Sequence, residues 1–190
     1  MKISIIGTGM IATEVIKMLR NEAKGIEITS IFSHSNKEKA MTLAKENDID
    51  HVYTDYAQLL KEDDADFVYI ALVNNAHYTY VRQALEAQRN VIVEKPFTST
   101  LEEAKLLAQM ARERGLYLFE AVTPLHTPNF QLVKQSLKRI APIHFAQCNF
   151  SQYSSRYERY LQGDIAPAFN PELGGGALND LNVYNINIIV

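Results

Sequence analysis

The sequence predicts an α/β fold, in which a Rossmann doubly wound parallel sheet is followed by the start of a second α/β domain. Two observations support the parallel sheet. Short β-branched runs alternate with amphipathic helical segments over residues 1–122, which is the pattern of βαβ units. The first of these runs ends in a glycine-rich turn that opens a helix. Because the alternation stops after residue 122, we predict a Rossmann domain over 1–122 and the N-terminal portion of a second domain over 123–190.

The composition is typical of a soluble globular protein. Of the 190 residues, 47% are hydrophobic and 22% are charged, and the net charge is −3. This slightly acidic chain lacks the basic surface expected of a nucleic-acid-binding protein. Its single cysteine, Cys148, excludes an intrachain disulfide and is interpreted as a small packing residue. We find neither a signal peptide nor an apolar run of roughly 18 residues, so we predict a cytoplasmic protein with no membrane partner.

Six strands are predicted in the first domain, each a short apolar run that ends at turn residues. They cover 2–6, 26–32, 51–54, 66–72, 91–94 and 116–121. A helix opens at residue 11, and further helices with the 3.6-residue apolar period cover 36–47, 56–60, 78–88 and 100–114. Asn36 and Asp55 are predicted N-caps, and Thr100 forms a capping box with Glu103. Connections of helical length imply parallel strands with helices on both faces of the sheet.

The second domain has a different pattern. A helix is predicted over 127–139, one long strand over 143–153, and a polar, aromatic loop over 154–172. Three glycines, 174–176, then lead into a helix that places Asp180 and Tyr184 on one face, because they are four residues apart. A single strand has no partner, and the chain ends in an apolar run. We therefore expect that a longer protein has been cut or that a partner chain completes this domain.

The turn Gly7-Thr8-Gly9-Met10-Ile11-Ala12 is the first candidate binding site, because it matches G-x-G-x-x-G/A between a strand and a helix. In this motif Gly7 permits the tight turn, Gly9 lets the backbone approach a pyrophosphate, and Ala12 keeps helix and strand close. The helix N-terminus offers free N–H groups to a phosphate. The alternative is a plain βα turn that uses glycine for its geometry.

The end of the second strand predicts which dinucleotide binds. An acidic residue there would bind the ribose 2′-hydroxyl of NAD, but the chain has Ser33, His34, Ser35 and Lys37, with no carboxylate before Glu38. Hydroxyl, imidazole and ammonium groups suit a 2′-phosphate, so we predict NADP in preference to NAD. The alternative for His34 and Lys37 is a solvated loop and helix start.

Polar residues also follow the fourth and fifth strands. Ala71, Leu72 and Asn74 are predicted to lie at the cofactor edge, and His77 opens the next helix. The apolar run 91–93 ends abruptly in Glu94, Lys95 and Pro96. A lysine at the carboxyl end of a buried parallel strand is a candidate for chemistry, and Pro96 shapes the turn that aims it. The alternatives are a solvated lysine and, for His77, a cap or surface residue.

Taken together, these motifs resemble the Gfo/Idh/MocA oxidoreductases. The resemblance is carried by the glycine turn, Asn74 with His77, Glu94-Lys95-Pro96, Glu120-Ala121, and the three glycines followed by Asp180 and Tyr184. It implies a Rossmann domain followed by an α/β domain whose open antiparallel sheet, incomplete here, often forms a dimer contact. It also implies hydride transfer between NAD(P) and a secondary alcohol or carbonyl of a sugar, polyol or diol, with no metal.

On this resemblance, four residues are candidates for catalysis. Lys95 would polarise the reacting oxygen, and Tyr184 would exchange the hydroxyl proton with its pKa lowered by Lys95. Asp180 would orient Lys95 or the substrate, and His77 would bind substrate or relay a proton. Glu94 and Lys95 are expected to contact the cofactor as well. The alternative function is an inactive nucleotide-binding sensor or regulatory protein on the same fold.

Overall fold

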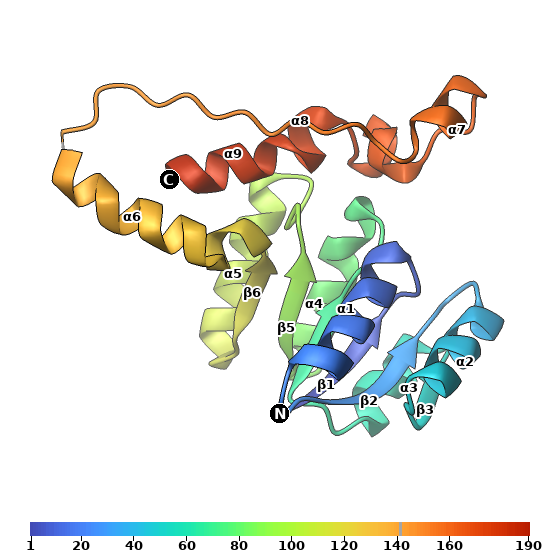
Figure 1. Cartoon of the computed structure of the whole chain (residues 1–190). Helices are drawn as coiled ribbons and strands as arrows, with labels where there is room; N and C mark the ends of the chain where they lie inside the picture. The colour runs from blue at the N-terminus through green and yellow to red at the C-terminus, as the bar shows by residue number, and fades with distance from the viewer. Residues whose placement is uncertain (141) are drawn as a thin grey trace. The chain divides into compact units, whose positions relative to one another are not determined.

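The computed structural model describes residues 1–140 and 142–190, which form two compact units, Met1–Glu120 and Ala121–Val190. The first unit contains one sheet of six strands in the order β3-β2-β1-β4-β5-β6 (Figure 1). The strands are β1 (Lys2–Ile6), β2 (Glu27–Phe32), β3 (His51–Tyr53), β4 (Phe67–Ile70), β5 (Asn90–Glu94) and β6 (Leu118–Ala121). All strand pairs from β3 to β5 are parallel. The predicted doubly wound parallel sheet is therefore confirmed.

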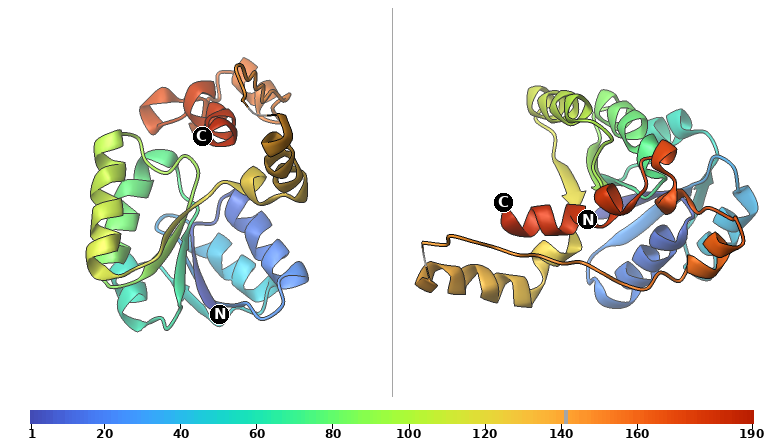
Figure 2. Two further views of the ribbon diagram at one scale, coloured as in Figure 1. Left: turned by 90° about the vertical axis from the view of Figure 1, so that its left-hand side faces the viewer. Right: turned by 90° about the horizontal axis from the view of Figure 1, so that it is seen from above.

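Helices cover both faces of this sheet (Figure 2). They are α1 (Met10–Glu22), α2 (Lys37–Glu46), α3 (Tyr56–Glu62), α4 (His77–Glu86) and α5 (Leu101–Arg114), with a short 3-10 helix η1 (Asn74–Ala76) before α4. One buried cluster joins α1 and α2 to the sheet, and a second joins α3, α4 and α5 to the opposite face. Each fully buried Ile or Leu of these clusters contributes about 1.5–3 kcal/mol of transfer free energy, so the sheet is a rigid base for the residues at its edge.

The predicted caps explain where three helices begin. The Asn36 side chain accepts from the Lys39 N–H, and Asp55 accepts from two N–H groups at the start of α3. Thr100 and Glu103 form the full capping box at α5. These caps satisfy N–H groups that have no partner within the helix. All three cap predictions are confirmed.

The described residues of the second unit after Ala121 form helices joined by irregular segments. The unit contains α6 (Pro128–Ile140), α7 (Tyr157–Leu161), α8 (Ala177–Asp180) and α9 (Asn182–Ile189), with 3-10 helices η2 (Thr123–His126), η3 (Pro167–Phe169) and η4 (Pro171–Leu173). The predicted helix over 127–139 is confirmed as α6. The predicted loop over 154–172 is wrong in part, because it contains α7 and the short 3-10 helices η3 and η4, which begin at prolines.

The predicted strand over 143–153 is wrong. Residues 142–154 form no strand, although their side chains alternate in polarity. A strand is held by hydrogen bonds to a neighbouring strand, and the described residues of this unit provide no such neighbour.

The predicted helix after the three glycines is also interrupted. Leu181 separates α8 from α9, so Asp180 and Tyr184 lie on two helices.

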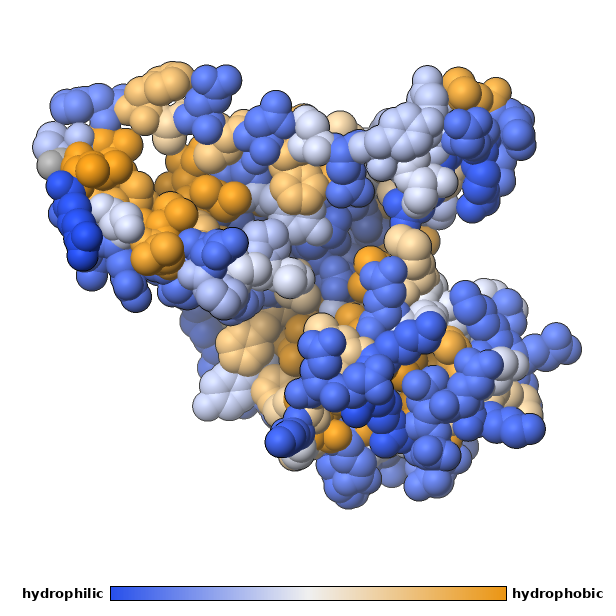
Figure 3. Space-filling view, in the orientation of Figure 1, coloured by the Kyte–Doolittle hydropathy of each residue, from blue (hydrophilic) through white to orange (hydrophobic). Residues whose placement is uncertain are grey.

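Hydrophobic side chains are exposed on the second unit. Among its described residues, Val122 and Ala166 are the buried hydrophobic ones. On α6, Leu132, Val133, Leu137 and Ile140 are 36–66% exposed, and Figure 3 shows hydrophobic side chains gathered over this helix. In the described part of the chain, no helix combines the length and the apolar character needed to cross a membrane.

Candidate active site

The carboxyl ends of the parallel strands bring predicted site residues of the first unit to one edge of the sheet. Gly7 follows β1, Ser33 follows β2, and Lys95 follows β5 (Figure 1). The strand order reverses between β1 and β4, and ligands of doubly wound sheets bind beyond the strand ends at such a switch point. The candidate site therefore starts where β1 and β4 end.

Gly7 is required by the packing of the chain itself. Its φ is +120°, a conformation that L side chains rarely adopt. A Cβ at this position would lie 2.3 Å from the Ala71 carbonyl oxygen at the end of β4. The Gly7 N–H also donates to the Phe32 carbonyl at 2.9 Å. Gly7 thus lets the chain turn tightly between β2 and β4.

Gly9 is different, because the protein itself does not need a glycine there. Its φ of −67° and ψ of −177° are open to any residue, and a Cβ at Gly9 would meet no atom within 4 Å. The residue is exposed directly before α1, whose first turn contains no acid. This leaves open space in front of helix N–H groups, which is a geometry that fits a pyrophosphate. Ala12, in contrast, is fully buried against the sheet.

The other residues of the turn and of the β4 end surround this space. Met10 and Ile11 are exposed, and Thr8, Leu72 and Asn74 are half-buried. Ala71 is 8% exposed, and its carbonyl is the oxygen close to Gly7. Since Ala71 has little surface, only its backbone can take part in binding.

The four residues predicted to select NADP have two different environments. Ser33 is 5% exposed, and its hydroxyl accepts the Asn36 N–H at 3.2 Å. It therefore shapes the turn after β2. His34, Ser35 and Lys37 are exposed, so their side chains are accessible to a ligand at this strand end.

Lys95 is half-buried and follows the last residue of β5. Glu94, immediately before it, accepts a hydrogen bond from the Tyr69 hydroxyl. Burial raises the pKa of Tyr69, and the neighbouring Glu94 charge raises it further, so the phenol remains a donor. The Lys95–Pro96 peptide bond is cis. Sequence reasoning missed Tyr69, although its place on the strand beside β5 was predictable.

His77 is fully buried at the start of α4. Its Nδ1 lies 2.9 Å from the Pro96 carbonyl oxygen, and its Nε2 lies 3.2 Å from that of Leu72. Burial lowers the pKa of His77, while the backbone carbonyls oppose this and nearby Lys95 lowers it further. A neutral imidazole has one N–H, so it can donate to one of these two carbonyls. His77 thus braces the turn after Lys95; its role toward substrate or proton stays a prediction.

The buried His77 makes stability depend on pH. Because its folded pKa lies below the ordinary value of about 6.5, the unfolded chain takes up a proton first as the pH falls. We expect the free energy of unfolding to be highest above about pH 6.5 and to decrease below it, by at most about 1.4 kcal/mol per pH unit from this residue. Urea unfolding at a series of pH values measures this slope.

His77→Gln should reduce the slope, whereas His34→Gln, at an exposed position, should leave it unchanged. An identical slope in wild type and His77→Gln would show that His77 is not a buried neutral histidine.

The second unit contains the other two catalytic candidates. Asp180 ends α8, and the Tyr184 N–H donates to the Leu181 carbonyl at 3.1 Å. The Tyr184 ring packs on Phe150, with ring centroids 4.5 Å apart. Phe150 was not predicted to contact Tyr184, because alternating polarity indicates which side chains share a face and not which ring they pack on. A joint action of Asp180 and Tyr184 with Lys95 stays a prediction.

The glycines before α8 fit closely against the same unit. A Cβ on Gly175 would lie 2.3 Å from the Pro167 carbonyl oxygen, and the Gly176 N–H donates to the Ala168 carbonyl at 2.8 Å. This close contact sets where α8 begins.

Across residues 1–140 and 142–190, no three His, Cys, Asp or Glu side chains are arranged to hold a metal ion.

Comparisons with known proteins agree with this geometry. A family model described as an oxidoreductase family with an NAD-binding Rossmann fold, Gfo/Idh/MocA, matches residues 1–122. The chain is 33% identical to the uncharacterized oxidoreductase YgjR of Escherichia coli K12, over 96% of this chain and 55% of that protein. It is 31% identical to the scyllo-inositol 2-dehydrogenase (NADP(+)) IolU of Bacillus subtilis, over 97% of this chain and 56% of that enzyme.

A solved structure shows a similar arrangement with a bound dinucleotide. It is a 3-ketoreductase from Actinomadura kijaniata in complex with NADP, with a TM-score of 0.66 and 32% identity over 73% of this chain and 44% of that one. The chain thus spans about half the length of the relatives that it matches.

Proposed function

The chain belongs to the Gfo/Idh/MocA oxidoreductase family, and we propose that it carries the NADP(H)-binding domain and the catalytic lysine of a hydride-transferring enzyme. The substrate would be a secondary alcohol or carbonyl of a sugar, polyol or diol, as in the named relatives that are inositol, xylose and dihydrodiol dehydrogenases. The observation that carries this proposal is the open space at Gly9, beside the switch point of the sheet.

Residues at three strand ends would hold the cofactor. The N–H groups at the start of α1 would bind the pyrophosphate, and His34, Ser35 and Lys37 would bind the 2′-phosphate. The β4 end, from Ala71 to Asn74, would border the rest of the molecule. When bound, the nicotinamide supplies or accepts the hydride; the protein orients it and holds the substrate.

The chain's own chemistry is charge stabilisation and proton movement. The Lys95 ammonium would bind the reacting oxygen and stabilise the negative charge that develops on it. The Tyr184 hydroxyl would give or take the proton of that oxygen, and Asp180 would orient Lys95 or the substrate. Tyr184 and Asp180 belong to the second unit, so these roles are proposals that rest on the family motif.

The alternative, an inactive nucleotide sensor, is not favoured. The matched family is one of oxidoreductases, and the relatives with assigned activities are named as dehydrogenases or reductases. A homodimer formed through the second domain and a cytoplasmic location stay predictions. We also propose that the boundary between the two domains lies between residues 122 and 123.

Titration with NADPH and NADH, followed by the fluorescence of the reduced nicotinamide, tests the proposal. Turnover is then measured over a panel of sugars, polyols and diols. Binding of NADPH without turnover of any such substrate, by a protein whose second domain is complete, would favour the sensor. Failure to bind either dinucleotide would refute the proposed site.

Lys37→Ala should lower the affinity for NADPH about tenfold and that for NADH less than twofold, since a charge-assisted contact contributes about 1.5 kcal/mol or more. Dissociation constants at fixed ionic strength measure this. Lys45→Ala, in the last turn of the same helix, is the matched control and should change neither constant. Equal affinities of wild type for the two cofactors would contradict the predicted preference for NADP.

A further inference from the structure

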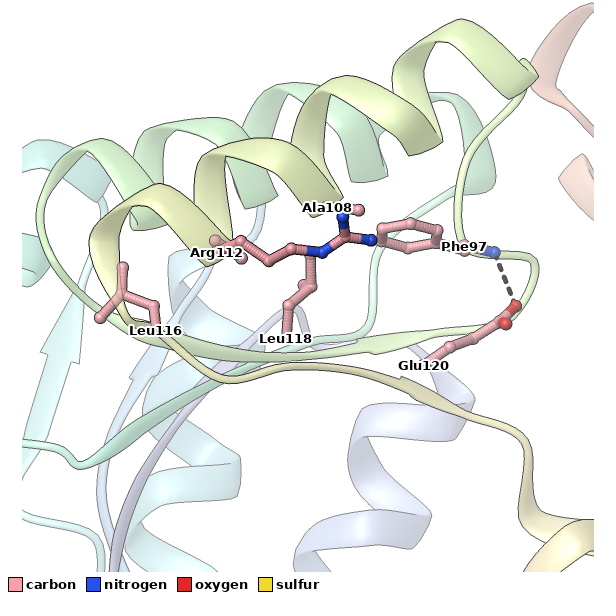
Figure 4. Close-up of a pocket in the computed structure, with 7 residues that line it drawn as sticks. Phe97, Ala108, Arg112, Leu116, Leu118 and Glu120 are labelled. Atoms are coloured by element: carbon pink, nitrogen blue, oxygen red, sulfur yellow. Dashed lines mark hydrogen bonds between the residues drawn. The ribbon is translucent and has the colours of Figure 1, made fainter.

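Glu120 is a half-buried acid that the proposed mechanism does not use. It lies on β6, beside β5 at the edge of the sheet, and it is the last residue of the first unit. Side chains alternate across a strand, so Glu120 and Leu118 point to the same face, the one covered by α5. Figure 4 shows the Glu120 side chain directed toward Phe97, in the turn that follows β5.

Glu120 binds the backbone next to the lysine turn. A carboxylate oxygen of Glu120 accepts the Phe97 N–H at 2.9 Å (Figure 4). Because Pro96 has no N–H, this is the first backbone donor after Lys95. Residues 97 and 120 are 23 positions apart, so the contact exists only because β5 and β6 are neighbours.

The same peptide group is held at its other end. The carbonyl of Pro96 and the N–H of Phe97 belong to one peptide plane. The carbonyl oxygen lies 2.9 Å from His77 Nδ1, and the N–H donates to Glu120. Side chains from α4 and from β6 therefore hold both polar atoms of the peptide that follows Lys95–Pro96.

The side chain of Phe97 packs against the hydrophobic core of the first unit. It lines a cavity of about 320 Å³ between α5 and β6, together with Ala108, Ala111, Arg112, Leu116, Leu118 and Glu120. The Phe97 ring packs against the hydrophobic core, and the peptide group before it is contacted at both polar atoms.

Two charged groups face Glu120. Burial raises the pKa of Glu120, and the Glu94 carboxylate adds to this, whereas the Phe97 N–H and the Lys95 ammonium lower it. The carboxylate thus lies close enough to Lys95 to interact with its charge.

We propose that Glu120 is a positioning residue for Lys95, and that it acts by binding the Phe97 N–H opposite the contact between His77 and the Pro96 carbonyl. The inference rests on the proposed function, in which Lys95 polarises the reacting oxygen. In this role Glu120 acts through the backbone turn that aims the ammonium, and not directly on the substrate or the cofactor.

The test compares Glu120→Ala with Glu120→Gln, whose amide oxygen can still accept the Phe97 N–H. Hydrogen exchange of that N–H, followed by NMR, should be at least about tenfold faster in Glu120→Ala than in wild type and near wild type in Glu120→Gln. In Glu120→Ala, kcat should fall about 10²-fold with KM changed less than threefold, because misplacing a reacting group by about 1 Å has this effect. Glu120→Gln should regain kcat to within about fivefold of wild type.

The outcomes separate this inference from the proposed function. NADPH affinity should stay within about twofold in both variants, since Glu120 lies away from the α1 turn, and an accompanying thermal melt checks that each variant folds. Equal exchange of the Phe97 N–H in wild type and Glu120→Ala would overturn the inference, as would a kcat that Glu120→Gln fails to regain. If wild type bound no NADPH, the proposed function would fail, and the exchange result would decide whether Glu120 holds the turn.

Discussion

Lys95→Met is expected to reduce kcat about 10³-fold and to change the dissociation constant of NADPH less than twofold. Methionine keeps the length and most of the volume of lysine but removes the charge. A preorganised charge that acts on the developing negative charge contributes about 3–4 kcal/mol to the transition state. The cofactor would be held mainly by the α1 turn and the β2 end, which the substitution leaves intact. Steady-state kinetics with NADPH, combined with fluorescence titration, measure both quantities.

Two further variants make this prediction specific. Lys105→Met removes a charge from an exposed position on α5 and should change neither constant. Tyr184→Phe removes a hydroxyl but keeps the ring that packs on Phe150, and it should lower kcat about 10²-fold through the lost proton transfer. If Lys95→Met retained more than a tenth of wild-type kcat, Lys95 would not be the group that polarises the reacting oxygen.

The two glycines of the α1 turn are expected to respond to alanine in opposite ways. Gly7→Ala should lower the free energy of unfolding by about 4 kcal/mol, because the new Cβ would lie 2.3 Å from a backbone oxygen at a φ of +120°. Gly9→Ala should cost at most about 1 kcal/mol, as for an alanine at a helix N-cap. It should nevertheless weaken NADPH binding at least tenfold, since the methyl group would occupy the space in front of α1.

Urea unfolding and NADPH titration of the two variants separate these effects. Wild-type affinity in Gly9→Ala would show that the pyrophosphate does not approach at Gly9, and the proposed cofactor site would lose its main support. Wild-type stability in Gly7→Ala would mean that the ends of β1 and β4 can move apart at little cost.

The sequence predicted the first unit well because its signals are local. The alternation of apolar runs and helical periods specified six strands and five helices in the right order. The caps at Asn36, Asp55 and Thr100 were predictable, because a capping side chain binds N–H groups two or three residues away. Gly7 and Gly9 were recognisable as a pair by their spacing. The motif assigned the tight turn to Gly7 and the approach of a pyrophosphate to Gly9, and the positive φ at Gly7 and the open space at Gly9 agree with this division.

The second unit was predicted less well, because its outcome depends on partners. The segment 143–153 alternates like a strand, but alternation only states which side chains share a face. Backbone pairing requires a second strand, and none forms in the described part of this unit. Likewise, the spacing of Asp180 and Tyr184 fits one helix face, but the helix is interrupted at Leu181, so the two residues lie on α8 and α9.

By itself, the sequence determined the doubly wound sheet, the glycine turn before α1, the basic and hydroxyl residues after β2, and the placement of Lys95 at a strand end. Only the tertiary structure decided which side chains hold the turn after Lys95. His77, Glu120 and Tyr69 are 19 to 25 residues away from their partners in or beside this turn. The physical reason is that strand pairing sets these separations: β4, β5 and β6 become neighbours when the sheet forms, and no local pattern records which polar atoms then meet.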